Sequence, residues 1–285
     1  MDKIYQIRHA YHSRALKSAM YLKKGHIPSI ADVSSKGSIR ISEAVITHIG
    51  ISLGKSQIEG QKAGKIFEQL TRDFLEEVFT YLKNVRPGKW RFSVHEEISD
   101  FAQYKHLGEL TNILKGEVPK DTRTNLKSLL GDYLVTPDVV VSRTPLADSE
   151  LDRTGELLKG GRHATFTPLR QSNSTSMILH ASISCKLTMR SDRAQNARTE
   201  ALNLIRNRKG NTPHISVVTA EPLPSRIASV ALGTGDIDCV YHFALPELQA
   251  AVQEKGNETD QEQLDMMING RRLRDISDLP FDLAI

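Results

Sequence analysis

The stretch from Met177 to Thr188, MILHASISCKLT, decides the fold. Side chains alternate in polarity along it, as they do in a β-strand. One face holds Leu179, Ala181, Ile183, Cys185 and Leu187, and the other holds His180, Ser182, Ser184, Lys186 and Thr188. A strand covered by helices on both sides should be apolar on both faces. The polar face therefore indicates either an edge strand facing solvent or a central strand facing a catalytic cleft.

Further strands and a helix surround this stretch in the second half of the chain. The sequence predicts a helix from Asp192 to Arg208 and strands at Asp138–Ser142 (DVVVS), His214–Thr219 (HISVVT) and Ile237–Phe243 (IDCVYHF), which are rich in β-branched residues. A strand, helix, strand order is typical of an α/β protein with a mixed or parallel sheet. We expect a mixed central β-sheet flanked by α-helices.

Helices dominate the first half. We predict a basic helix from Met1 to Lys24, closed by the Gly25–Pro28 break, then a polar loop from Ala31 to Ser42. A stronger helix spans Gln57 to Lys83, where apolar residues recur every three or four positions. The last predictions here are a strand at Trp90–Val94 and a helix from Ser99 to Lys115 that carries Phe101, Tyr104, Leu107 and Leu114.

No repeat or linker divides the chain, so we expect a single domain over residues 1–285. Its helical N-terminal half would span 1–130, and the sheet and recognition segment would span 131–285. The 285 residues are 39% hydrophobic, enough for a substantial core, and the formal net charge is +4. There is no apolar run of about 18 residues and no apolar stretch at the N-terminus, which predicts a cytoplasmic protein without membrane contact. Cys185 and Cys239 fit no zinc or redox spacing, and we expect two thiols.

Three residues could form a hydrolytic site. Asp138 opens an otherwise apolar strand, Lys186 lies on the polar face of another, and Glu200 lies on the following helix. Two carboxylates that hold Mg²⁺, with a lysine beside the same phosphate, suit phosphodiester hydrolysis. Each residue alone is equally typical of an ordinary surface.

Positive charge is concentrated around this trio. Between Lys186 and Lys209 there are seven basic residues against two acidic ones. The block ArgSerAspArg at 190–193 lies where the strand passes into the helix. Two arginines can each bind a guanine edge while an aspartate accepts from cytosine N4. We also expect Ser191 or Asp192 to cap the helix.

These residues resemble a known family. The spacing of Pro137-Asp138, Ser184-Cys185-Lys186, ArgSerAspArg and Glu200 resembles the CCGG-cutting restriction endonucleases, a branch of the PD-(D/E)XK superfamily. Most of that superfamily has an acidic residue where Ser184 stands, but in this branch a carboxylate from the next helix replaces it, which matches Glu200. The resemblance extends over nearly all of 178–285 in HASISCK, MRSDRAQNAR, NLIRNRKG, PHISVVTAEP, PSRIASVALGTG, DCVYHFAL and NGRRLRDISDLP, with shorter traces in RPGKW, TPDVVV and GQKAGKIFE.

The resemblance implies an activity and roles for particular residues. It implies a type II endonuclease that cuts double-stranded DNA at GCCGGC after the first G, leaves 5′-phosphates and uses two Mg²⁺ ions per active site. It also implies a homotetramer, a dimer of dimers, with a methyltransferase as a separate chain. The implied catalytic residues are Asp138, Lys186, Glu200 and the accessory acid Glu68, and the implied metal ligands are Asp138, Glu200 and the Cys185 carbonyl. The implied DNA-contacting residues are Arg190, Asp192 and Arg193 at the CCGG core, Gln61 from the minor groove, Arg226 with Asp32 at the outer base pair, and Ser184.

Other interpretations remain open from the sequence. GlyIleSerLeuGlyLysSer at 50–56 resembles a P-loop, but it has three residues between the glycines where four are required. A DNA-binding regulator without catalysis would also use Arg190 and Arg193, although carboxylates beside phosphates would oppose binding. A structure-specific repair nuclease could share the core, but the ArgSerAspArg block disfavours it. His9 and His12 lack further metal ligands and are expected on a helical surface, whereas Trp90 is expected in the core.

Overall fold

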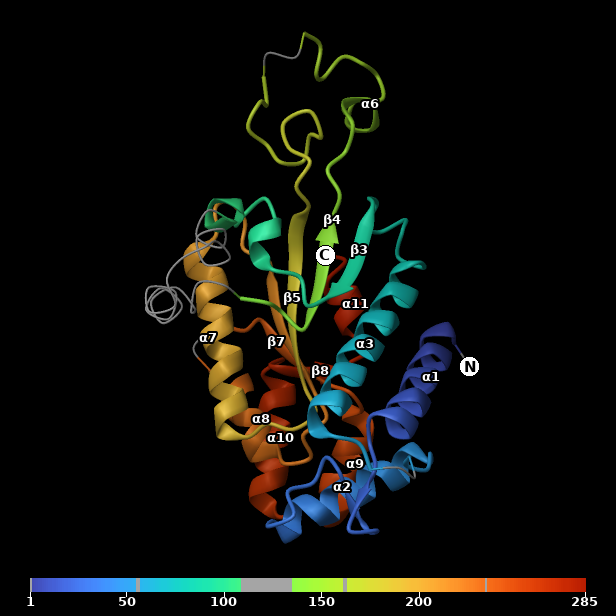
Figure 1. The fold of residues 1–285 in the computed structure, drawn as a ribbon. Helices are drawn as coiled ribbons and strands as arrows, with labels where there is room; N and C mark the ends of the chain where they lie inside the picture. The colour runs from blue at the N-terminus through green and yellow to red at the C-terminus, as the bar shows by residue number, and fades with distance from the viewer. Residues whose placement is uncertain (1, 55–56, 109–134, 161–162, 234) are drawn as a thin grey trace.

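A six-stranded sheet forms the centre of the protein. The computed structural model describes residues 2–54, 57–108, 135–160, 163–233 and 235–285 (Figure 1). The strand order is β3-β4-β5-β6-β7-β8, with antiparallel pairing from β3 to β5 and parallel pairing from β5 to β8. The strands are β3 Trp90–Val94, β4 Val139–Arg143, β5 Ile178–Lys186, β6 His214–Thr219, β7 Cys239–His242 and β8 Leu273–Asp275. The mixed α/β architecture predicted from the sequence is confirmed.

The strand β5 lies inside this sheet. It pairs antiparallel with β4 and parallel with β6. The edge-strand interpretation of its polar face is therefore wrong. Ser182 and Ser184 on that face are buried, with 6% and 8% of their surface exposed.

Helices pack around the sheet. In the first half they are α1 Lys3–Ser18, α2 Lys36–Ile49 and α3 Gly60–Phe79; in the second they are α7 Ser191–Asn207, α8 Pro224–Ala231, α9 Leu245–Lys255, α10 Glu258–Asn269 and α11 Leu279–Asp282. The short helix α6 Asp148–Leu151 lies apart from the sheet (Figure 1). The long helix α3 contacts β3, β4 and β5 and supports α1, while α8 contacts β7 and α10. Two short strands, β1 Leu22–Lys23 and β2 Ile27–Pro28, form a separate small sheet. Among the described helices, none has the length and apolar character needed to cross a bilayer.

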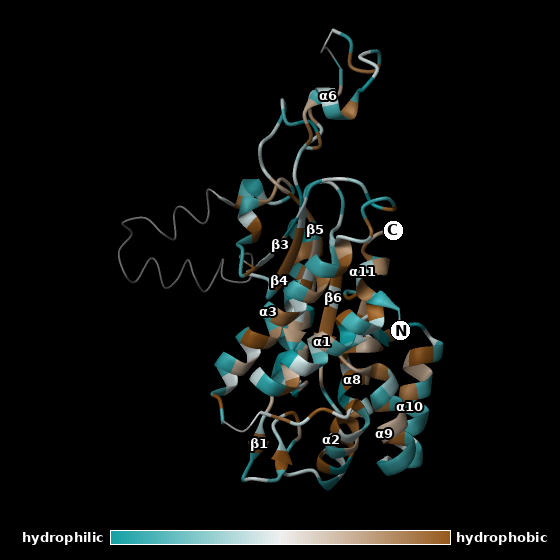
Figure 2. Cartoon of the chain, turned by 90° about the vertical axis from the view of Figure 1, so that its right-hand side faces the viewer, coloured by the Kyte–Doolittle hydropathy of each residue, from teal (hydrophilic) through white to brown (hydrophobic). Residues whose placement is uncertain are grey.

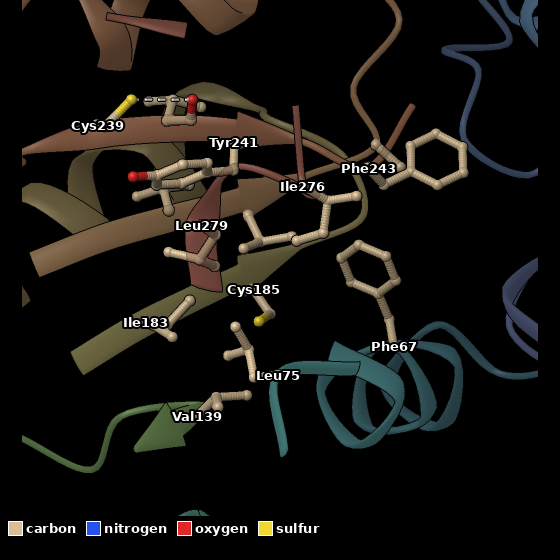
Figure 3. Close-up of a cluster of buried hydrophobic side chains, with 14 of the residues drawn as sticks. Phe67, Leu75, Val139, Ile183, Cys185, Cys239, Tyr241, Phe243, Ile276 and Leu279 are labelled. Carbon is tan, nitrogen blue, oxygen red and sulfur yellow. Dashed lines mark hydrogen bonds between the residues drawn. The ribbon is translucent and has the colours of Figure 1, made fainter. Parts of the chain in front are cut away.

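Apolar side chains join the sheet to its helices. Strands of the large sheet are mostly hydrophobic in Figure 2, whereas the helices around them carry both kinds of residue. Figure 3 shows Ile183 and Cys185 of β5 directed towards Leu75 and Phe67 of α3. Both cysteines are buried thiols, as predicted. Because Cys185 faces the core, the next residue, Lys186, faces the opposite side of the strand.

The predicted loop from Ala31 to Ser42 is wrong from residue 36 onward, where α2 begins. Ser35 caps this helix by accepting a hydrogen bond from the Ser38 backbone N–H. Its buried face includes Ser38 and Ser42, both fully buried, and it packs against α9. Small polar residues on the buried face concealed the apolar periodicity that would have indicated a helix.

Other predicted boundaries also change. The helix predicted over Met1–Lys24 ends at Ser18, and β1 follows it. The helix predicted over Ser99–Lys115 is replaced by 3₁₀ turns at Ile98–Asp100 and Lys105–Leu107. Its buried Phe101, Tyr104 and Leu107 lie in the core, and its remainder, including Leu114, lies outside the described residues. The P-loop resemblance fails because Gly50 is the left-handed C-cap of α2, so a helix and not a strand precedes it.

The described residues between β4 and β5, 144–160 and 163–177, form an arm. It projects beyond the end of the sheet and carries α6 (Figure 1). Arg170 holds the arm together, since its guanidinium binds both carboxylate oxygens of Asp148 at 2.7 and 2.8 Å and the His163 carbonyl at 2.7 Å. Leu157 and Phe166 on this arm are 78% and 97% exposed.

Two buried histidines make the fold sensitive to acid. His12, expected on a surface, is 2% exposed, and its Nε2–H donates to the Phe243 carbonyl at 2.6 Å. His242 is 1% exposed, and its Nδ1 accepts the Ala244 N–H at 3.2 Å. Burial is the main cause that lowers the pKa of each from 6.5 to about 4. Between these two values the unfolded chain binds protons that the folded chain excludes, so stability falls as the pH drops from 6.5 towards 4.

We predict that His242→Asn will weaken this acid sensitivity. The asparagine side chain can still accept the Ala244 N–H but takes up no proton, so one source of the pH dependence is removed. The slope of unfolding free energy against pH should become shallower by up to about 1.4 kcal/mol per pH unit. Urea unfolding between neutral and mildly acidic pH measures it, with His9→Asn as the control because His9 is exposed. An unchanged slope in His242→Asn would show that the buried imidazole does not carry the effect.

Candidate active site

Asp138 is the centre of a set of contacts at one end of the sheet. It comes directly before β4, and the antiparallel register that pairs Val139 with Ile183 brings it beside the end of β5. One oxygen, Oδ2, accepts the Cys185 backbone N–H at 2.7 Å and the Lys186 Nζ at 2.7 Å. The Ser184 hydroxyl lies 3.4 Å from the same oxygen. Strand pairing thus brings together two of the residues singled out from the sequence.

The Asp138–Lys186 ion pair is largely shielded from solvent, with side-chain exposures of 14% and 19%. Burial lowers the pKa of Lys186, but the charge of Asp138 and its hydrogen bond outweigh burial and raise the pKa overall. Lys186 is therefore held as a cation beside the carboxylate. In that state it can interact with an anionic phosphate.

Glu200 reaches this pair from α7, whose buried face consists of Ala194, Ala197, Ala201 and Leu204. Burial raises the pKa of Glu200, the charge of Lys186 opposes this, and the charge of Asp138 adds to it. The helix following β5 therefore brings a second carboxylate within electrostatic range of Asp138 and Lys186.

A third acid, Glu68 on α3, also lies close to Asp138. Its Oε2 is 2.9 Å from His95 Nε2, and ligand atoms of Glu68, His95 and Asp138 lie within 4.8 Å of one another. Burial and the nearby charge of Asp138 raise the pKa of Glu68. Carboxylate oxygens are the ligands that Mg²⁺ prefers. Among the residues that the structure describes, Glu68, His95 and Asp138 place their ligand atoms close enough together to share a metal ion, and Glu200 is not a member of this group.

Sequence reasoning missed His95. It follows β3 in a left-handed conformation, with φ of 55°. Nothing in the sequence near His95 resembles a metal motif, and pairing of β3 with β4 brings it to Asp138. A non-glycine residue with positive φ beside two carboxylates is the kind of strained position found at functional sites.

The ArgSerAspArg block lies at the junction of β5 and α7. Arg190 occupies the N-cap position, and no side chain makes a capping hydrogen bond there, so the predicted cap by Ser191 or Asp192 is wrong. Arg190 and Asp192 are exposed, whereas Arg193 is half-buried and donates to the Thr188 hydroxyl at 2.6 Å. Side chains not used for capping are available to a ligand in front of the helix.

Asp32 and Arg226, named together from the resemblance, form an ion pair in the structure. With Lys23, Arg190 and Arg193 they line a cavity of about 180 Å³. Burial and then the charge of Arg190 lower the pKa of Lys23, which reflects the crowding of cations here. Gln61 is exposed in the first turn of α3, next to Gly60 at the cavity wall. The basic cavity and the acidic site thus share one end of the sheet.

An acid opening one strand, a lysine ending its antiparallel neighbour and a mixed sheet flanked by helices are the features expected from the resemblance to PD-(D/E)XK nucleases. The chain belongs to the NgoMIV restriction enzyme family, whose profile matches residues 11–285. It is 44% identical over 287 residues to the type II restriction enzyme NgoMIV of Neisseria gonorrhoeae. The alignment covers 98% of this chain and 98% of that enzyme. The protein is thus a type II restriction endonuclease that cuts DNA at a specific sequence. Because the chain belongs to this restriction enzyme family, the two other functions considered from the sequence, a non-catalytic DNA-binding regulator and a structure-specific repair nuclease, are excluded.

Two solved structures of restriction enzymes with DNA are more distant. The PspGI complex with substrate DNA is 14% identical, covers 88% of this chain and 95% of its own, and has a TM-score of 0.27. The Bse634I complex with cognate DNA is 12% identical, covers 80% and 81%, and has a TM-score of 0.25. Because these TM-scores are low, the family assignment rests on the family match and on the identity to NgoMIV.

Proposed function

We propose that this enzyme cuts double-stranded DNA at GCCGGC after the first G, with Mg²⁺ as cofactor, and leaves 5′-phosphates. The observation that carries the proposal is the shielded contact of Asp138 with Lys186 and the Cys185 N–H, with Glu200 and Glu68 nearby. Further support comes from the family match and from the basic cavity beside this site. The single domain that we propose for residues 1–285 is supported by one apolar cluster, whose members run from Ile7 to Ala284.

The donor chemistry of the site fits a divalent metal. Asp138, Glu200 and the Cys185 carbonyl would hold Mg²⁺, and Glu68 would serve as an accessory acid. Two ions per site are proposed, and when bound they supply a lowered pKa of water and neutralisation of phosphate charge. The carboxylates repel one another in this half-buried site, which a cation would relieve. Lys186 would hold a non-bridging oxygen of the scissile phosphate, and Cys185 keeps Asp138 oriented through its N–H.

We predict that Asp138→Ala, Lys186→Ala and Glu200→Ala will each lower the cleavage rate by at least about 100-fold, because each removes charge from the transition state. Binding of a GCCGGC duplex in Ca²⁺ should persist for all three variants, since the residues proposed to read bases lie elsewhere. Digestion and gel-shift assays on the same preparations measure both. Glu254→Ala is the control, because Glu254 is a half-exposed acid whose ion pairs are with His48 and Lys255. Cleavage within ten-fold of wild type by Asp138→Ala or Lys186→Ala would contradict the active-site assignment, and normal cleavage by Glu200→Ala would contradict the displaced-carboxylate role.

We propose that Arg190, Asp192 and Arg193 read the CCGG core in the major groove. Gln61 would approach from the minor groove, Arg226 with Asp32 would contact the outer base pair, and Ser184 would face the DNA beside Asp138. An arginine bound to guanine O6 and N7 gives roughly 1–3 kcal/mol of discrimination, whereas a phosphate contact adds affinity without sequence preference.

Arg193→Ala should therefore lower the affinity for a GCCGGC duplex towards that for a scrambled duplex. Arg206, exposed on the same helix, is the matched position. Arg206→Ala should weaken both duplexes about equally and make the salt dependence shallower by up to about one unit. Titrations of both duplexes over a salt series in Ca²⁺ measure the difference. Full preference for the palindrome in Arg193→Ala would remove this block from base recognition.

We propose that the protein assembles as a tetramer, a dimer of dimers, through the arm between β4 and β5. A contact between copies would cover its exposed Leu157 and Phe166. We also propose that the enzyme acts in the cytoplasm and that a separate methyltransferase modifies the same DNA site.

The double variant Leu157→Ser with Phe166→Ser should dissociate tetramers into smaller species, because it replaces apolar surface with hydroxyls. Sedimentation velocity measures the mass, and Leu232→Ser provides a control at an exposed leucine outside the arm. A variant that remains tetrameric would exclude these side chains from the contact, and a monomeric wild-type protein would exclude the assembly.

A further inference from the structure

Glu221 is a fully buried carboxylate, with 0% of its surface exposed. It comes two residues after the end of β6. Its Oε2 accepts the Met189 backbone N–H at 2.7 Å, and its Oε1 accepts the Leu223 backbone N–H at 3.2 Å. Each carboxylate oxygen thus holds one backbone N–H from a different segment.

Both segments lead to residues proposed to read DNA. Met189 comes directly before Arg190, the first residue of the ArgSerAspArg block. Leu223 is the N-cap residue of α8, and that helix carries Arg226. Arg226 Nη1 also lies 3.9 Å from Glu221 Oε2 while the same guanidinium pairs with Asp32. One carboxylate therefore connects the start of the ArgSerAspArg block with the start of α8.

We propose that Glu221 is a positioning residue for specificity, which holds the ArgSerAspArg block and Arg226 in a fixed relation so that both can contact one DNA site. This inference rests on the proposed role of those residues in reading bases. Glu221 touches neither the acidic site nor, by this account, the DNA.

The chemistry of the position requires a carboxylate. A glutamine has the same shape but only one acceptor oxygen, so it can hold one N–H while its amide group opposes the other. Burial is the main cause that raises the pKa of Glu221 to about 7, and the two N–H groups and Arg226 act against it. Burying the ionised carboxylate costs free energy, and the hydrogen bonds from the two backbone N–H groups offset part of that cost.

Glu221→Gln isolates the contribution of the second acceptor. We expect the ratio of affinities for GCCGGC and scrambled duplexes in Ca²⁺ to fall by about ten-fold or more, equivalent to about 1.4 kcal/mol. Affinity for the scrambled duplex should stay unchanged. Leu223→Pro provides a second variant, because it removes the N–H that binds Oε1. Since it also removes a partly buried leucine side chain, it is compared with Leu223→Ala, which loses that side chain but keeps the N–H. Leu223→Pro should lower the same ratio.

Gln103→Met is the matched control. Gln103 is 5% exposed and binds both the N–H and the carbonyl of Leu179, at the opposite end of β5. Its loss should reduce the free energy of unfolding, measured by urea denaturation, and leave the affinity ratio at the wild-type value. A fall in the ratio for Gln103→Met equal to that for Glu221→Gln would overturn the proposal, since general destabilisation would then explain both.

Arg193→Ala in the same assay separates two kinds of failure. If it loses the preference while Glu221→Gln and Leu223→Pro retain it, the positioning role is overturned and the base-reading assignment stands. If Arg193→Ala retains the preference, the base-reading assignment is overturned, and the positioning role falls with it.

Discussion

The contact of Asp138 Oδ2 with the Lys186 ammonium and the Cys185 N–H is the interaction on which the proposed active site depends. It joins the start of β4 to the end of β5. The antiparallel pairing of these two strands therefore also determines how Asp138 and Lys186 lie relative to each other. A shift of one residue in register would turn Lys186 towards the core and Cys185 towards the site. Burial of Cys185 against α3 opposes that shift, and the core thereby fixes which side chain faces Asp138 (Figure 3).

The two ends of the sheet carry different features. Because β5, β6 and β7 are parallel, their carboxyl ends meet at one end, where ligands bind in open α/β sheets. Lys186, Glu221 and the ArgSerAspArg block therefore lie at this end of the sheet. Because β4 is antiparallel to β5, its start brings Asp138 to the same end. The arm leaves from the opposite end (Figure 1). The residues proposed for catalysis and for base recognition therefore lie at one end of the sheet, while the arm at the other end remains available for the proposed contact with another copy.

Much of the fold could be predicted because its strands are rich in β-branched residues and β5 alternates without interruption. Helix α2 could not, because Ser38 and Ser42 lie on its buried face. At the site, Asp138 stood out because it opens an otherwise apolar strand, and Lys186 because it lies on a polar face of β5 that a buried strand would not be expected to have. His95 and Glu221 did not, since their roles depend on contacts between segments distant in the chain: one through strand pairing and the other through backbone N–H groups that are identical in every sequence.

Anomalous scattering from crystals of the protein with a GCCGGC duplex, soaked in Mn²⁺, tests most directly the claim that Asp138 organises the active site. Mn²⁺ takes the same oxygen ligands as Mg²⁺ and gives a signal that identifies its position. We expect an anomalous peak coordinated by the Asp138 carboxylate, with the Lys186 contact retained beside it. A metal bound by Glu68 and His95 without Asp138, or no metal at this end of the sheet, would contradict the account.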